Sequence, residues 1–294
     1  MKYISIILSL LINISFCIGL KALVIPNNAT MIAISGSGVS DYIDININPA
    51  SIHKLSPQVS FSNNQWFGDL QGNKISYLWS KNNYKNFISF ESLGLDDIEL
   101  RDEVPSDNPI GYTEAKWMAI DYVNTMPLDL MFPNSNIDLG YKLKFNYSKL
   151  HTNRYYGYSL DLGMIKQFDN INIGATIKNI GKENMGSSYE TINPRYTLGV
   201  STNIPFSNKN QQYNNWKLYA DLVYEDKEMI YKVASKVQFS FIELMLGSSY
   251  SDNYQDFSYG LSFHFNDWSI IYGSLNHENP ILGSPVCFEI SKQF

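Results

Sequence analysis

The residues from Asn136 to Ser148, NIDLGYKLKFNYS, alternate strictly between apolar and polar side chains. The apolar set begins at Ile137 and ends at Tyr147, and every residue between its members is polar or glycine. A helix cannot place such a set on one face, whereas a strand can, because successive side chains of a strand point to opposite sides. A run of about eleven residues is long for an ordinary strand. It matches the ~9–11 residues that a tilted strand needs to cross a bilayer.

The same alternation recurs along the chain after residue 57. It predicts fourteen strands, an even number that brings both ends of a single-chain barrel to one side. The predicted strands are Val59–Phe67, Ile75–Trp79, Phe87–Leu93, Glu114–Asn124, Ile137–Tyr147, Tyr156–Met164, Ile171–Ile177, Tyr196–Val200, Trp216–Tyr224, Met229–Val237, Ile242–Tyr250, Phe257–Phe265, Trp268–Tyr272 and Val286–Phe294. The pattern predicts an all-β fold, a transmembrane antiparallel β-barrel of about fourteen strands.

Composition agrees with a membrane barrel but does not separate it from a large soluble β protein. The chain has 294 residues, of which 44% are hydrophobic and 14% aromatic. After the N-terminus we find no apolar run of the ~18 residues that a transmembrane helix requires. The net charge of −6 argues against nucleic acid as a partner, because phosphate binding needs a basic surface.

Three parts follow from this division of the chain. Residues 1–22 are typical of an export signal, with Lys2 before an apolar run and Ala22 as a small residue at the cut. Cys17 allows a lipoprotein interpretation, but bulky Phe16 precedes it and disfavours lipid attachment. Residues 23–56 lack alternation and predict a plug-like loop and short-helix segment inside or against the barrel, the alternative being a disordered exported N-terminus. Residues 57–294 form the predicted outer-membrane barrel.

The connections assign sides to the barrel. The links Leu95–Thr113 and Asn179–Asn193 are long, and we expect them outside the cell; the links near Phe168–Asn170, Ser240 and Asn266–Asp267 are short and expected in the periplasm. The link Thr125–Ser135 is an exception, since it is long and apolar on the periplasmic side. The last strand supplies a C-terminal barrel signal, with Phe288, Ile290 and the terminal Phe294 in phase.

Alternation also gives each side chain a face. We expect Asp138, Lys142, Lys144, Asp161 and Lys178 to point into the lumen, and Ile137, Leu139, Tyr141, Leu143 and Phe145 to face lipid. The five tryptophans fall mostly at strand ends, which is typical of an interfacial aromatic belt; they are Trp66, Trp79, Trp117, Trp216 and Trp268.

We find no pattern that indicates an enzyme, a cofactor or a metal site. The histidines are His53, His151, His264 and His277, and none lies near a nucleophile motif. The acidic loop from Asp96 to Asp107 is rich in oxygen ligands, but it lacks the EF-hand pattern and is better interpreted as solvated.

Several motifs resemble the PorV/PorQ family, a branch of the FadL-like outer-membrane barrels. They are Ser35–Ala50, which ends in Asn48, Pro49 and Ala50, then Phe61–Trp66, Leu93–Gly111, Asp161–Gly163 and Ile177–Gly181. The N-terminal block holds fewer glycines and alanines than is usual, and the apolar link Thr125–Ser135 is also atypical, so the resemblance is to a divergent member.

The resemblance implies a role at the outer membrane of a Gram-negative cell. Members of this family serve type IX secretion, which implies protein export or surface attachment through the outer loops, with exported proteins or secretion and attachment components as partners. The alternative implied by FadL itself is a channel for uptake of hydrophobic small molecules. Under both interpretations we expect the chain to contact outer-membrane lipid and the barrel-assembly machinery.

Overall fold

A computed structural model describes residues 25–81, 84–101, 107–127, 135–184, 188–206, 214–277 and 283–294. The proposed signal at Met1–Ala22, with Cys17, lies outside the described residues. Within the described ranges, no helix is long and apolar enough to cross a membrane. The strands are β1 (Gln58–Gln65), β2 (Gln71–Lys81), β3 (Tyr84–Leu100), β4 (Gly111–Pro127), β5 (Ile137–Leu150), β6 (Asn153–Gln167), β7 (Ile171–Asn184), β8 (Tyr189–Thr191), β9 (Arg195–Phe206), β10 (Asn214–Glu225), β11 (Glu228–Phe239), β12 (Ile242–Tyr250), β13 (Gln255–Phe265), β14 (Trp268–His277) and β15 (Val286–Gln293).

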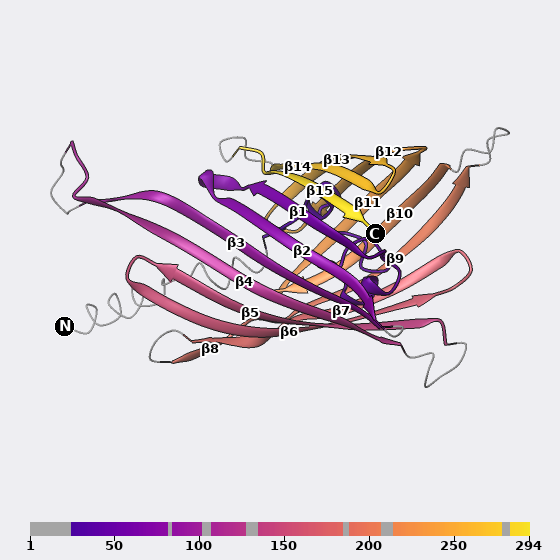
Figure 1. Cartoon of the computed structure of the whole chain (residues 1–294), viewed down its shortest axis with the longest axis horizontal. Helices are drawn as coiled ribbons and strands as arrows, with labels where there is room; N and C mark the ends of the chain where they lie inside the picture. Colours follow the sequence, from indigo (N-terminus) through magenta and orange to yellow (C-terminus); the bar gives the residue numbers. More distant parts are fainter. Residues whose placement is uncertain are drawn as a thin grey trace.

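The strands close into one antiparallel barrel (Figure 1). Strands that follow one another in the sequence pair, except β8 with β9; β1 pairs with β15, and β7 pairs with both β6 and β9. The short β8 pairs only with β7, so the closed ring has fourteen strands. All fourteen strands predicted from alternation are therefore confirmed, and closure of the ring pairs the first strand with the last, so that the sheet has no free end strand among the fourteen.

Alternation along each strand separates an outer from an inner face. In β5 the even-numbered residues from Asp138 to Ser148 are buried, while Phe145 is 61% exposed. Exposed aromatic and aliphatic side chains cover the outer face of the other strands in the same way. The outer face is apolar and the inner face is polar, as a membrane barrel requires.

The barrel has two distinct ends. The first, here called the terminal end, holds Pro57 and Phe294, and the Phe294 amide donates to the Pro57 carbonyl oxygen at 3.1 Å. The opposite end, here called the loop end, holds the β3–β4 hairpin, which projects beyond the other strands at the left of Figure 1. The turn at Asp226–Lys227 also lies at the loop end, between β10 and β11.

Two expected loops are largely strand. The link Leu95–Thr113 is shortened because β3 continues to Leu100 and β4 begins at Gly111, across a register shift between Leu95 and Ile98. The link Asn179–Asn193 is shortened because β7 continues to Asn184 and pairs with β8. Backbone pairing continues past the alternating stretch because its hydrogen bonds do not depend on alternation of the side chains. Most of the atypical link Thr125–Ser135 lies outside the described residues.

The N-terminal segment, residues 25–57, fills the lumen and is here called the plug (Figure 1). It contains the helix α3 (Ala29–Ala33) and the 3-10 helix η1 (Pro49–His53); a further 3-10 helix, η2 (Phe67–Asp69), lies in the β1–β2 link. Asn28 and Asn48 cap α3 and η1 by accepting the amides of Met31 and Ala50. The core is formed where these short helices meet the inner wall, and it includes Ile34, Ile47, Ile52 and Met245.

Candidate functional site: the filled lumen

The motif Asn48-Pro49-Ala50 fastens the plug to β5 and β6. The Asn48 amide donates to the carbonyl oxygens of Val39, at 2.6 Å, and Met164, at 3.1 Å, while its oxygen accepts from Ala50 at 2.9 Å. One fully buried side chain thus joins two parts of the plug to the wall. Only a side chain that carries both an acceptor and two donors can make this set of bonds.

The opposite wall holds the middle of the plug by charged groups. The Asp221 carboxylate of β10 accepts the amides of Gly38, at 2.7 Å, and Val39, at 3.0 Å. Lys232 of β11 donates to the Ser35 carbonyl oxygen at 2.7 Å. These bonds satisfy backbone groups that are not paired in a helix or sheet. An irregular segment buried in a barrel requires such bonds, because its backbone groups cannot reach water.

Asp41 is a charged residue of the plug itself. Its carboxylate lies 2.7 Å from Lys217 and accepts from the Tyr219 hydroxyl at 3.1 Å. Burial acts to raise the pKa of Asp41, but the charge and hydrogen bond of Lys217 outweigh it, so the pKa is lowered from its usual value. The plug therefore keeps an ionised carboxylate at this position.

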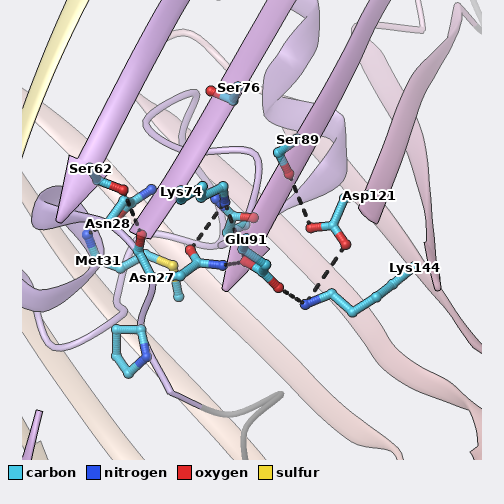
Figure 2. A network of polar contacts seen from close by, with 12 residues as sticks. Asn27, Asn28, Met31, Ser62, Lys74, Ser76, Ser89, Glu91, Asp121 and Lys144 are labelled. Atoms are coloured by element: carbon cyan, nitrogen blue, oxygen red, sulfur yellow. Dashed lines mark hydrogen bonds and ion pairs between the residues drawn. The ribbon is translucent and has the colours of Figure 1, made fainter. Parts of the chain in front are cut away.

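A buried ion-pair network lines the wall from β2 to β6. Lys144 lies 2.6 Å from Glu91 and 3.8 Å from Asp121, and Lys142 lies 3.0 Å from Asp161 and 3.9 Å from Asp121. Figure 2 shows how the plug joins this network, since Asn27 donates to Glu91 and accepts from Lys74 at 3.2 Å. Removal of one member would leave the remaining buried charges incompletely compensated; loss of one partner of a buried ion pair costs about 3–5 kcal/mol.

The remaining residues predicted to face the lumen contact the plug. Asp138 accepts from the Tyr42 hydroxyl and lies 3.4 Å from His53. Lys178 donates to the Asn46 carbonyl oxygen at 2.6 Å. Together with Lys142, Lys144 and Asp161, these residues lie on the inner face.

The residues predicted to face lipid lie on the other face. Leu143 is 37% exposed, and Ile137, Leu139 and Tyr141 are half-buried between their neighbours. At the C-terminus, Phe288 and Phe294 are exposed and Ile290 is half-buried.

The expectation of a tryptophan belt is wrong for Trp117. Its side chain points inward and packs with Leu93 and Ala119, and Lys144 lies 5.7 Å from its ring centroid. Trp66 also departs from the belt, because it lies beside Phe67 and lines a cavity of the lumen. Position at a strand end did not reveal the face of either residue; for Trp117 the alternation did, because Trp117 is out of phase with the outward Ile120. Within the described ranges, no cluster of three metal-ligating side chains occurs.

Inward-facing glycines were missed by sequence reasoning. A Cβ atom added to Gly140 or Gly163 would lie 2.4 Å from Pro49 or 2.0 Å from Asn48, so the plug backbone passes directly against the wall. The same close approach occurs at Gly174, Gly247, Gly260 and Gly273. The sequence did contain a signal for this close approach, because these glycines fall in phase with the inward polar residues of their strands.

A cavity of about 180 Å³, here called the loop-end cavity, lies on the loop-end side of the plug. Its floor includes Met31 and Val39 of the plug. The walls combine apolar side chains with charged ones and are formed by Trp66, Phe67, Val223, Ile230 and Leu275, with Lys178, Arg195, Thr197, Glu225, Lys232 and Asp256. Arg195 pairs with Glu225 at 3.5 Å. The cavity is concave and mixed in character, because five charged side chains stand beside the apolar ones.

Two solved structures with a similar fold are named as channels, although sequence comparison gives no relative. No protein-family model and no curated protein matches the sequence. TodX, a monoaromatic hydrocarbon channel solved as its deltaS2 mutant, has a TM-score of 0.56 at 10% identity, over 91% of this chain and 98% of its own. CymD, a second monoaromatic hydrocarbon channel, also has a TM-score of 0.56 at 10% identity, over 91% of this chain and 97% of CymD. The outer-membrane protein Omp33 of Acinetobacter baumannii has a TM-score of 0.47 at 5% identity, over 81% of this chain and 98% of Omp33.

The fold is that of the outer-membrane β-barrels, and the filled lumen makes this chain a plugged barrel. Identities of this order establish the fold alone. The likeness to PorV/PorQ proteins has no family model behind it and stays a prediction.

Proposed function

We propose that the protein resides in the outer membrane, with the terminal end in the periplasm and the loop end outside the cell. The apolar outer face and the closed ring support this location, because lipid tolerates neither polar outward side chains nor unpaired strand edges. The signal at residues 1–22 would direct export, and the C-terminal phenylalanines would direct assembly.

The function supported best is uptake of small, mainly apolar molecules through the barrel, without catalysis or a cofactor. The loop-end cavity carries this proposal. Its volume of about 180 Å³ is close to that of a ~150 Å³ protein cavity that binds benzene. The neighbours TodX and CymD are named as monoaromatic hydrocarbon channels, which agrees with a ligand of that size.

The plug decides how transport would proceed. Its residues form the floor of the loop-end cavity, and bonds to Asp221, Lys232 and Met164 hold it to the wall. A molecule bound in the cavity therefore passes only when part of the plug moves.

A pair of neighbouring substitutions tests this function. Thr197 lines the cavity, whereas the next residue, Leu198, is exposed on the outer face. Thr197→Trp should fill the cavity and reduce uptake of radiolabelled toluene by cells that carry the protein, whereas Leu198→Trp should leave uptake unchanged. Equal amounts of heat-modifiable barrel in the outer membrane establish that both variants fold. Unchanged uptake by Thr197→Trp would contradict the channel function.

Protein export or surface attachment of the PorV/PorQ type is a second candidate. The observation that favours it is the β3–β4 hairpin, which extends beyond the barrel as a surface for a protein partner (Figure 1). Affinity capture from outer membranes should then recover exported proteins or attachment subunits, and a variant with this hairpin shortened should lose them. Recovery of the same proteins by both forms would remove this candidate.

A further inference from the structure

The outer face of β5 and β6 changes character in a fixed order towards the loop end. Aliphatic side chains come first, aromatic ones follow, and a cation stands last. On β5 the order is Leu143, Phe145, Tyr147 and Lys149, and on β6 it is Leu160, Tyr158, Tyr156 and Arg154. The hydrocarbon, interfacial and headgroup regions of a bilayer favour side chains in this order, so the two cations lie at the level of lipid headgroups.

Cations also stand on the two neighbouring strands, which lie beside β5 and β6 in Figure 1. Lys116 of β4 lies opposite Lys149, and Lys149 lies opposite Arg154. Lys182 of β7 is exposed on the same outer face, opposite Tyr158. The residues Lys116, Lys149, Arg154 and Lys182 are here called the basic rim. Like charges directly opposite each other on one face are destabilising, so the rim favours an anion beside it.

Carboxylates compensate only the β4 side of the basic rim. Glu114 accepts from Lys116 and lies 2.8 Å from Lys149, and Asp96 lies 3.6 Å from Lys116. Among the residues that the structure describes, no carboxylate forms an ion pair with Arg154 or Lys182. The β6 and β7 side therefore presents two exposed cations without a counter-charge.

The opposite wall of the barrel carries acidic residues at the corresponding level. Tyr224 of β10 and Tyr250 of β12 are exposed on the outer face near the loop end. Two residues beyond them stand Asp226 and Asp252. The basic rim is therefore a local feature of β4 to β7 and not a general property of the strand ends.

The separation of the two uncompensated cations indicates the kind of anion. Lys182 lies opposite Tyr158, which is four residues from Arg154 along β6. At ~3.3 Å per residue the offset is roughly 13 Å along the strand. Two cations so far apart match a headgroup with phosphates at both ends better than the single phosphodiester of a phospholipid.

We propose that the basic rim binds the phosphate groups of a phosphorylated glycolipid of the lipid A type in the outer leaflet. The inference rests on the proposed location, with the loop end outside the cell, and does not depend on uptake through the lumen. Arg154 offers a planar guanidinium for two parallel hydrogen bonds to one phosphate, and Lys182 offers an ammonium to the other. The acyl chains lie along the exposed apolar side chains below the rim, such as Phe145 and Tyr158.

The affinity of the purified protein for lipids in detergent micelles tests this proposal. The probes are lipid A with both phosphates, the same lipid without its phosphates, and phosphatidylglycerol, and binding is measured by native mass spectrometry. The unaltered protein should bind the bisphosphorylated lipid at least about tenfold more tightly than either other probe, because only this lipid places phosphates on both cations. Equal affinity for the lipid without phosphates, or for phosphatidylglycerol, overturns the proposal.

A pair of double variants assigns the binding to the rim. Arg154→Gln with Lys182→Gln should weaken binding of bisphosphorylated lipid A at least about tenfold. The matched control is Lys166→Gln with Lys292→Gln, which removes two cations from the terminal end. It should change the affinity less than about twofold, because its charges lie more than a Debye length from the rim. Heat modifiability shows that both double variants form the barrel, and equal affinities for the two overturn the assignment.

Amine labelling of intact cells with a membrane-impermeant reagent tests the location separately. Lys227, exposed in the loop-end turn, should be labelled, whereas Lys81, exposed at the terminal end, should be labelled only after permeabilisation. The reverse result overturns the outer-leaflet assignment whatever the affinities in micelles. Expected labelling without selectivity for bisphosphorylated lipid A overturns the lipid site alone and leaves the proposed location standing.

Discussion

Leu143 and Lys142 are adjacent residues on opposite faces of β5, and their tolerance of arginine should differ. Leu143→Arg places a charge against lipid near the middle of the strand, which should cost about 2–4 kcal/mol of unfolding free energy. Lys142→Arg keeps a positive charge beside Asp161 and should cost less. The measurement is denaturant unfolding in phospholipid vesicles, and equal losses would contradict the assignment of faces.

Asp41 and Lys217 should make stability depend on pH. The pKa of Asp41 is lowered in the folded protein, so the folded state binds fewer protons than the unfolded state between the two pKa values. The stabilisation is therefore complete above the unfolded pKa of about 3.9 and is lost as the pH falls through the folded value.

A comparison with Asp41→Asn measures this dependence. The difference in unfolding free energy between the wild type and Asp41→Asn should be constant near neutral pH and should shrink below about pH 4. A difference that grows towards acid pH would show that the pKa of Asp41 is raised instead.

At the scale of elements, the wall was predictable because lipid dictates it. Every strand had to carry an apolar face with a period of two, so the alternation around Leu143 and its counterparts revealed the fourteen strands directly. Where lipid ends, that constraint ends as well. The extension of β3 to Leu100 and the pairing of β8 with β7 had no comparable signal.

The plug was predictable as a loop and short-helix segment inside or against the barrel, but its path was not. Its path depends on contacts with many separate strands, such as Asn48 with Met164 and Gly38 with Asp221, and no local pattern encodes those partners. The inward glycines were the one sequence trace of its course. Their use as a signal would have required knowledge that the lumen is filled by backbone.

Close contact between plug and wall gives a prediction at this scale. An added Cβ at Gly163 would lie 2.0 Å from the Asn48 side chain and 2.8 Å from Pro49, so Gly163→Ala must displace η1. We expect a loss of about 1–3 kcal/mol in unfolding free energy. Gly111→Ala is the matched control, because its nearest contact is a Leu100 methyl at 3.8 Å, and it should change stability by less than about 0.5 kcal/mol. Similar losses for both would show that the plug does not pass against β6.

For the whole molecule, the defining feature is a barrel whose lumen holds its own N-terminal segment. The ion pairs of β2 to β6 stiffen one side of the wall, while Asp221, Lys232 and Ser258 hold the plug against the other. Under the proposed function, uptake requires part of the plug to leave the second side. A covalent tie at that contact should therefore stop uptake while leaving the fold intact.

Ser35 of the plug and Ser258 of β13 offer the position for this tie, because their hydroxyl oxygens lie 2.7 Å apart. The decisive measurement is toluene uptake by cells carrying Ser35→Cys with Ser258→Cys, in a Cys287→Ala background and beside each single-cysteine control, before and after addition of a reductant. The disulfide should form in the oxidising periplasm. Uptake should be absent in the oxidised double variant and should return on reduction. Full uptake with the disulfide formed would contradict transport through a movable plug.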